Sequence, residues 1–171
     1  MSLRTVTALL TVTACMIVVS CSGKGRSADQ DFYFTTLKTG GEERVSFDID
    51  LSDTTCIYGI SLVSRFKKDA ECSNVTFTVS LTSPSGQSGS ERVTLSSDYR
   101  TVKEYIRNNP EDGRIQAASA PGYYDISWLY RSNIRPQEYG EWTMTVSAVP
   151  EAGTGIIGIG IIINKIPLAG Q

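Results

Sequence analysis

The chain has 171 residues, with 16 basic and 18 acidic side chains, a net charge of −2 and no histidine. The missing histidine excludes histidine-based triads, histidine-ligated metals and histidine pH switches. No basic run is present, which argues against nucleic-acid binding, because that needs a clustered positive patch.

The N-terminus resembles a secretory leader. One basic residue, Arg4, precedes an apolar stretch of about 14 residues from Val6 to Val19, and Ser20-Cys21-Ser22-Gly23 follow. The stretch is shorter than the roughly 20 residues that span a bilayer. We therefore predict a lipoprotein signal peptide over residues 1–20 and acylation, for example with palmitate, at Cys21. The alternatives are secretion without a lipid, and attachment at Cys15, which leaves an apolar core of only about eight residues.

Residues 21–30 are small and polar and are predicted to form a flexible tether. From Asp31 onward the main signal is an alternation of apolar and polar residues, which is typical of half-buried strands. The alternating runs are 45–51, 75–81, 124–130 and 142–148, with weaker runs at 32–37, 58–66 and 91–96. Many short strands separated by turn residues predict one antiparallel, jelly-roll-like β-sandwich over residues 31–167, an all-β fold.

Two segments depart from this rhythm. Residues 155–163 are almost all apolar, which predicts a central strand buried on both faces. Gly158 and Gly160 share one face of it, so a bulky group, such as the ring of Trp128 or Trp142, is expected across them. Residues 98–120 show helical spacing, with Thr101 and Glu104 placed as in a capping box. We predict an irregular, part-helical insert there and a candidate partner contact, or an ordinary excursion between two sheets.

Cys56 and Cys72 lie just before two of the predicted strands. If those strands form a hairpin, the two cysteines stand at its opposite ends, about 33 Å apart, whereas a disulfide needs Cα atoms within about 7 Å. Free buried thiols are therefore favoured over a bridge.

Asp48 and Asp50 share one face of a predicted strand and, with Asp53, are the best candidates for a calcium site or an acid–base pair. A solvated strand face explains the same pattern more simply. The sequence shows no phosphate loop, no Cys-x-x-Cys pair and no nucleophile elbow. We predict no catalytic residue, no metal, no cofactor and no enzymatic activity.

The densest aromatic cluster comprises Tyr123, Tyr124, Trp128 and Tyr130. The alternation of Tyr124, Trp128 and Tyr130 favours a place in the core for these three over a sugar-stacking platform or a protein-binding hot spot. Arg65 and Arg131, each near a strand end, are better candidates for specific polar contacts. With Tyr130 and Asn133 they make up the predicted partner or ligand contacts.

The order of several motifs resembles the gliding-motility lipoprotein GldH family of Bacteroidota, over most of the chain from Asp31 to Lys165. The residues that carry the resemblance are Phe32-Tyr33-Phe34, Val45–Leu51 with Asp53-Thr54-Thr55, Tyr58, Leu62, Arg65, Thr82–Gly86, Tyr130-Arg131-Ser132-Asn133-Ile134, Gly140-Glu141-Trp142-Thr143, Gly155, Gly158 and Gly160. Residues 99–120 match poorly.

The resemblance implies a non-enzymatic envelope lipoprotein associated with gliding and secretion machinery, which also occurs in species that do not glide. Surface-export signals of that phylum tend to be acidic after the lipidated cysteine, whereas residues 22–26 here are neutral and basic. This favours an outer-membrane anchor facing the periplasm.

Three hypotheses follow. The first is a membrane-anchored accessory or interaction component of the cell envelope that contacts other envelope proteins. The second is a glycan-binding lipoprotein module that uses surface aromatics. The third, the weakest, is a hydrolase that uses Asp48 and Asp50.

Overall fold

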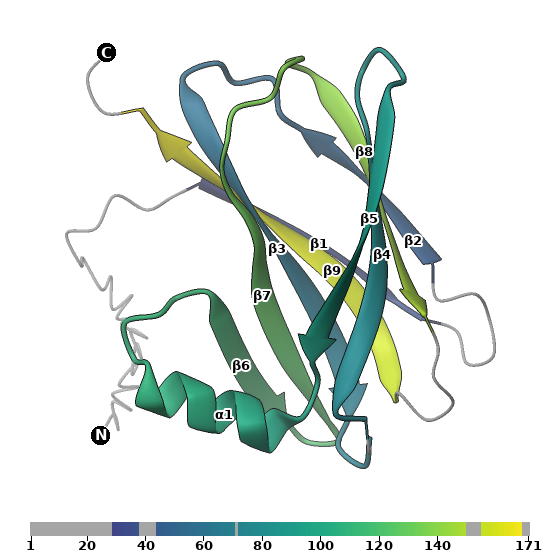
Figure 1. Ribbon diagram of the computed structural model, residues 1–171, viewed down its shortest axis with the longest axis vertical. Helices are drawn as coiled ribbons and strands as arrows, with labels where there is room; N and C mark the ends of the chain where they lie inside the picture. Colours follow the sequence, from purple (N-terminus) through teal and green to yellow (C-terminus); the bar gives the residue numbers. More distant parts are fainter. Residues whose placement is uncertain (1–28, 38–43, 71, 150–154, 169–171) are drawn as a thin grey trace, which may run out of the picture.

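The computed structural model describes residues 29–37, 44–70, 72–149 and 155–168, which form two antiparallel β-sheets packed as a sandwich (Figure 1). Sheet A has 5 strands in the order β1 (Asp29–Thr36), β9 (Ile156–Pro167), β3 (Cys56–Lys67), β7 (Tyr123–Ile134) and β6 (Ile115–Ala120). Sheet B has 4 strands in the order β2 (Arg44–Asp50), β8 (Glu141–Val149), β4 (Asn74–Thr82) and β5 (Ser88–Ser96).

The strand order is that of a jelly roll. When the edge strand β6 is set aside, four strands remain in each sheet, in the orders β1-β9-β3-β7 and β2-β8-β4-β5. Apart from β4 and β5, which pair as a hairpin within sheet B, successive strands of these eight lie in opposite sheets, as in two nested Greek keys. The predicted all-β, jelly-roll-like sandwich is confirmed.

The alternation that predicted the strands also builds the core. In β2, Val45, Phe47 and Ile49 are buried while the residues between them are exposed. β9 lies between β1 and β3, as its apolar sequence predicts. β1 begins at Asp29, two residues before the predicted start of the domain at residue 31.

The predicted cover of Gly158 and Gly160 is an aromatic ring, but neither tryptophan supplies it. The ring of Phe34, on the neighbouring strand β1, crosses both glycines on the outer face of sheet A. A Cβ on Gly160 would lie 2.5 Å from the carbonyl oxygen of Tyr33 and 2.8 Å from Phe34 Cδ2. Trp128 instead faces the core, and Trp142 belongs to sheet B. The prediction failed because it did not anticipate that β1 pairs with β9.

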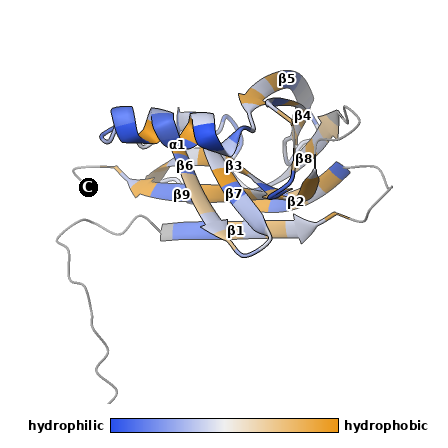
Figure 2. Cartoon of the chain, turned by 90° about the horizontal axis from the view of Figure 1, so that it is seen from below, coloured by the Kyte–Doolittle hydropathy of each residue, from blue (hydrophilic) through white to orange (hydrophobic). Residues whose placement is uncertain are grey.

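The insert after β5 is more regular than expected. It contains the helix α1 (Tyr99–Asn108) and the strand β6, which extends sheet A beside β7. Figure 2 shows α1 over β6, with hydrophilic residues along much of the helix. Asp98, rather than Thr101, caps the helix, since its carboxylate accepts bonds from the backbone N–H groups of Arg100 and Thr101. Val102 is buried and fixes the helix to the sandwich.

Cys56 and Cys72 are free thiols, as predicted, although the hairpin behind that prediction does not exist. β3, which begins at Cys56, and β4, which follows Cys72, belong to different sheets. Cys56 is buried, and the Sγ–H of Cys72 donates to the carbonyl oxygen of Asn74 at 2.7 Å.

Candidate functional site: a cleft between β5 and β7

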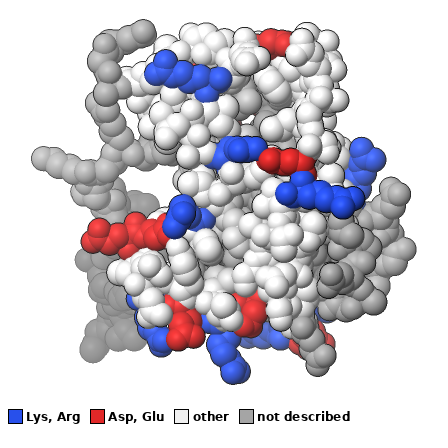
Figure 3. All heavy atoms as spheres, viewed as in Figure 1, with Lys and Arg blue, Asp and Glu red and all other residues white. Residues whose placement is uncertain are grey.

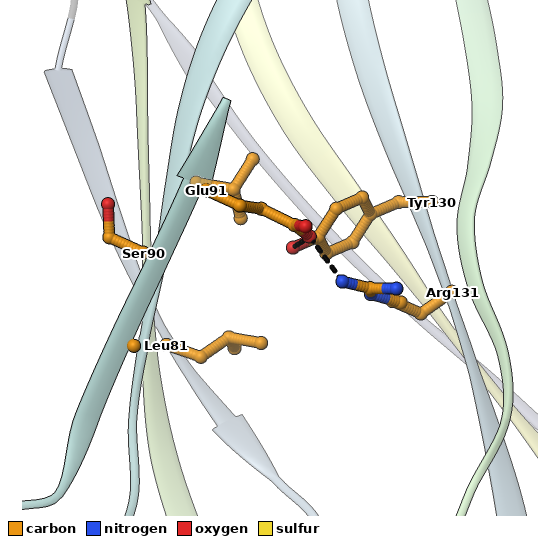
Figure 4. Close-up of a pocket in the computed structure, with 7 residues that line it drawn as sticks. Leu81, Ser90, Glu91, Tyr130 and Arg131 are labelled. Atoms are coloured by element: carbon orange, nitrogen blue, oxygen red, sulfur yellow. Dashed lines mark hydrogen bonds and ion pairs between the residues drawn. The ribbon is translucent and has the colours of Figure 1, made fainter. Parts of the chain in front are cut away.

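Two of the four predicted contact residues meet at the open side of the sandwich, where β5 of sheet B faces β7 of sheet A. Tyr130 Oη donates a hydrogen bond to Glu91 Oε1, and Arg131 Nη2 lies 2.5 Å from the same oxygen. Figure 4 shows Glu91 extending from β5 toward both residues of β7. One carboxylate therefore links the two sheets at a point where no backbone pairing joins them.

Neighbouring residues of a strand normally point to opposite faces, so a local irregularity must bring Tyr130 and Arg131 to one carboxylate. The pairing of β7 with β3 supplies it. Ser61 pairs with Leu129 and Ile60 with Arg131, so β7 carries an extra residue, Tyr130, in this interval. Such a bulge re-aims side chains, and here it lets both residues reach Glu91.

A second irregularity follows at Asn133. This residue has a φ of 54°, in the left-handed region, which asparagine tolerates better than most residues. It lies where the register with β3 shifts again, between the pairs Ile60–Arg131 and Tyr58–Ile134. Its side chain is exposed and forms none of the described hydrogen bonds to Glu91. Asn133 thus shapes the strand beside the cleft and does not line it.

The linked residues border an open cleft of about 270 Å³. Its lining combines apolar and polar side chains with a glycine backbone: Val79, Leu81, Gly89, Ser90, Glu91, Tyr130 and Arg131. An adjoining hollow of about 170 Å³ shares Glu91, Tyr130 and Arg131 and reaches inward to Trp128. Trp128 is 4% exposed, and its Nε1–H is buried without a hydrogen-bond partner among the described residues. The cleft is therefore apolar inside and charged at its mouth.

The charges at the mouth balance. The hydrogen bond from Tyr130, together with the charge of Arg131, holds the pKa of Glu91 below its usual value. Burial and the bond to Glu91 raise the pKa of Tyr130 to about 12. At neutral pH the cluster therefore contains a carboxylate, a neutral phenol and a guanidinium. Arg131 keeps 53% of its side chain exposed and Glu91 41%, so both can meet a partner.

Unpaired strand edges flank the cleft. Among the described residues β5 pairs only with β4, and β6 pairs with β7 only as far as Trp128. The N–H of Leu129 still donates to the carbonyl oxygen of Arg114 at 2.7 Å, and beyond Leu129 the described part of β7 pairs on one side only, with β3. Both edges present free backbone N–H and C=O groups beside the charged cluster.

Arg65 lies elsewhere, on the outer face of sheet A. Its Nε and Nη2 donate to the two carboxylate oxygens of Asp125 at 2.7 and 2.8 Å. Its guanidinium is stacked between the rings of Phe34 and Tyr123, at 4.7 and 4.1 Å from their centroids. The structure thus joins Tyr130 to Arg131 and separates Arg65 from them.

Glu91 is the cleft residue that the sequence did not indicate. It occupies the inward-facing register of a weak strand, in line with Val93 and Leu95. An acidic residue on an apolar strand face needs a partner, and this was the available signal. Tyr124 and Trp128, by contrast, lie in the core, as their alternation predicts.

The three aspartates considered for a metal or acid–base pair have local structural roles. Asp48 accepts a bond from Thr143 Oγ1 at 3.1 Å. Asp50 and Asp53 accept from backbone N–H groups two residues ahead, at 2.9 and 2.8 Å, which fixes the turn before β3. Within the described residues no group of three or more potential ligands could hold a metal ion.

Cys21 and the predicted tether up to Ala28 lie outside the described residues. In the part of the chain that is described, no helix is long and apolar enough to cross a bilayer. No family model, curated protein or solved structure matches the chain. The fold and cleft define a jelly-roll β-sandwich with a bridged inter-sheet cleft, and the resemblance to the GldH family stays a prediction.

Proposed function

We propose that this chain is a lipid-anchored, non-catalytic interaction component of the cell envelope, similar to the GldH lipoproteins, and that it contacts a partner protein through the cleft between β5 and β7. The anchor is Cys21, and the outer membrane, on its periplasmic face, is the proposed location. The observation that carries the proposed surface is the meeting of Glu91, Tyr130 and Arg131 between two unpaired strand edges.

The composition of the cleft supports a protein partner. Tyrosine and arginine are enriched among the residues that dominate binding energy at protein interfaces. Tyr130 is held by Glu91, so little side-chain entropy is lost when it is covered. The apolar hollow behind it, lined by residues such as Leu62 and Val93, offers space for a side chain of the partner. The tether raises the local concentration, which makes a modest interface sufficient.

The glycan alternative rested on Trp128, Tyr130 and the pair Tyr123 and Tyr124, and two of these four rings are buried. Trp128 and Tyr124 are 4% and 5% exposed, so neither ring offers a face on which a sugar could stack. The described surface of the cleft favours the first hypothesis for this site.

Site-specific photocrosslinking in living cells tests the proposal. A photoreactive phenylalanine replaces Gly89, an exposed cleft residue that shares the inward register of Glu91 and where a Cβ meets no atom within 4 Å. A control places it at Thr94, which is exposed on the opposite face of the same strand and does not line the cleft. We expect one envelope protein to be captured from Gly89 and not from Thr94. Equal capture from both positions, or none from Gly89, would refute the proposed surface.

The anchor has its own test. Mass spectrometry of the mature N-terminal peptide should give a diacylated or triacylated Cys21, and Cys21→Ser should release the protein from membranes. An unmodified mature N-terminus would exclude the anchor and leave the cleft to be judged by the crosslinks.

A further inference from the structure

A second depression crosses the molecule on the outer face of sheet A, away from the cleft. It has a volume of about 410 Å³, and its lining comes from all five strands of the sheet and from the loop before β6. We call it the sheet A groove. Its floor is formed by side chains that alternate with the core-facing ones, among them Ser61 on β3, Ser127 on β7, Ile162 on β9 and Gln116 on β6.

The groove is rich in neutral hydrogen-bonding groups. Gln30 Nε2 donates to Asn164 Oδ1 at 2.7 Å. The other polar atoms of the two side-chain amides, Gln30 Oε1 and Asn164 Nδ2, can still accept and donate hydrogen bonds. Ser127 and Gln116 stand opposite each other in the pairing of β7 with β6. Among the described residues that line the groove, Arg114 alone is charged, and it is paired with Asp112 at 2.7 Å.

An aromatic stripe borders the groove. Phe32, which pairs with the groove residue Ile162, is 61% exposed and stacks on Phe34 with ring centroids 6.0 Å apart. Beyond Phe34 the stripe continues through the guanidinium of Arg65 to the ring of Tyr123. Because Gly158 and Gly160 have no side chains, the ring of Phe34 in this stripe packs directly on the backbone of β9. An exposed ring edge thus lies next to a row of amides and hydroxyls.

We propose that the sheet A groove binds a neutral polysaccharide or oligosaccharide chain lying across the strands. Sugar hydroxyls donate and accept, which matches amide and serine side chains, while sugar C–H faces pack on apolar residues such as Phe32 and Ile162. The groove does not include Trp128 or Tyr130 of the aromatic cluster that the sequence indicated, and only Tyr123 of that cluster belongs to the bordering stripe.

Other ligand classes fit the groove less well. An acidic polymer would need several free cations, whereas the lining holds one paired arginine. A peptide adding as a strand needs free backbone groups, but the floor strands β9, β3 and β7 are paired on both sides where they form the groove. A neutral, hydroxyl-rich chain needs neither free cations nor free backbone groups, so it is the ligand class that fits the groove best.

Calorimetric titration of the purified chain tests the proposal with four neutral probes: cellohexaose, maltohexaose, laminarihexaose and N-acetylchitohexaose. Polygalacturonate serves as the acidic comparison. We expect saturable binding of at least one neutral probe at millimolar concentration. Gln116→Ala, at an exposed position, should weaken it by about 3- to 10-fold, the value of one neutral hydrogen bond.

A blocking variant locates the site. Ser127→Trp should fill the groove and abolish binding, while Thr94→Trp adds the same bulk to the other sheet and should leave binding unchanged. Absence of binding to all four neutral probes overturns the proposal, as does binding of polygalacturonate alone or wild-type affinity in both Gln116→Ala and Ser127→Trp. None of these outcomes bears on the crosslinks from Gly89, so the groove and the cleft fail or succeed separately.

Discussion

Two arginine–carboxylate clusters of this protein use the same chemistry in different settings. On the outer face of sheet A, Arg65 and Asp125 belong to strands paired in register, and their side chains are 30% and 27% exposed. At the cleft, Arg131 and Glu91 come from different sheets and are 53% and 41% exposed. The first pair is bidentate and stacked between two rings, whereas the second shares one oxygen with a tyrosine.

The Arg65 cluster is therefore a fixed structural element, whereas the Arg131 cluster is accessible to a partner. Two parallel hydrogen bonds and two ring faces hold the Arg65 guanidinium in one orientation. Arg131 makes a single contact with Glu91 and keeps donors facing solvent. On the face shown in Figure 3, charged side chains of both signs are interspersed and none forms an extended patch of one sign. Recognition at the cleft therefore depends on local groups and not on a long-range field.

We expect the largest effect from substituting the two glycines that lie under the ring of Phe34, next to the outer-face cluster. Gly160→Ala should lower the free energy of unfolding by about 1–3 kcal/mol, because its Cβ would lie 2.5 Å from the backbone oxygen of Tyr33. Gly158→Ala meets mainly the ring tip of Phe34. In a Phe34→Ala background the cost of Gly158→Ala should disappear, while that of Gly160→Ala should remain. Urea denaturation of the three single and two double variants measures the cost of each glycine substitution with and without the ring of Phe34.

If Phe34→Ala rescued both glycine variants equally, the close approach of the β1 backbone to β9 would be wrong. Such a result would also remove the physical basis for the aromatic stripe, because the ring of Phe34 could then shift freely.

Removing one carboxylate from each cluster sharpens the comparison directly. Asp125→Asn should cost about 1–2 kcal/mol of unfolding free energy, because it weakens a bidentate pair that is less than one-third exposed. Glu91→Gln should cost less than about 0.5 kcal/mol, as expected for an exposed pair screened by solvent. Chemical denaturation at neutral pH gives both values. A larger loss for Glu91→Gln would mark the cleft cluster as a structural clamp between the sheets.

The backbone beside the cleft gives a third, smaller effect. Asn133 has a φ of 54°, so Asn133→Ala should cost about 1 kcal/mol and Asn133→Gly close to nothing. Thermal unfolding of the two variants tests this, with Ser132→Ala, an exposed neighbour, as the control. Equal stability of the alanine and glycine variants would contradict the left-handed conformation and with it the second bulge.

The sequence predicted most of the fold because alternation reports directly on burial. Val75, Phe77 and Val79 alternate with threonines and are buried as expected. The cleft could not be predicted in the same way, since Tyr130 and Arg131 share a partner only through a register shift with β3. A register shift depends on how two distant strands pair, which the local pattern of either strand does not encode. Glu91 was missed for a related reason, because its partner lies in the opposite sheet.

At acidic pH the smallest expected effect is the dependence of stability on the protonation of Glu91. The pKa of Glu91 is lowered on folding from about 4.5, so its bonds to Tyr130 and Arg131 stabilise the fold above that value. This contribution is lost as pH falls through the lower pKa of the folded state. The difference in unfolding free energy between the wild type and Glu91→Gln should therefore be constant near neutrality and shrink below pH about 4.5.

The opposite limb involves Tyr130, whose pKa rises on folding from 10.0 to about 12. A raised pKa means that the folded state binds the phenolic proton more tightly, so this stabilisation is complete below pH 10 and is lost as pH approaches 12. Tyr130→Phe should lack that alkaline loss of stability. Tyr123→Phe, in the Arg65 cluster, is the matched tyrosine control and should keep it. If Tyr130→Phe lost stability between pH 10 and 12 as steeply as the wild type, the hydrogen bond between Tyr130 and Glu91 would not persist in solution, and the cleft would have no fixed charged mouth to offer a partner.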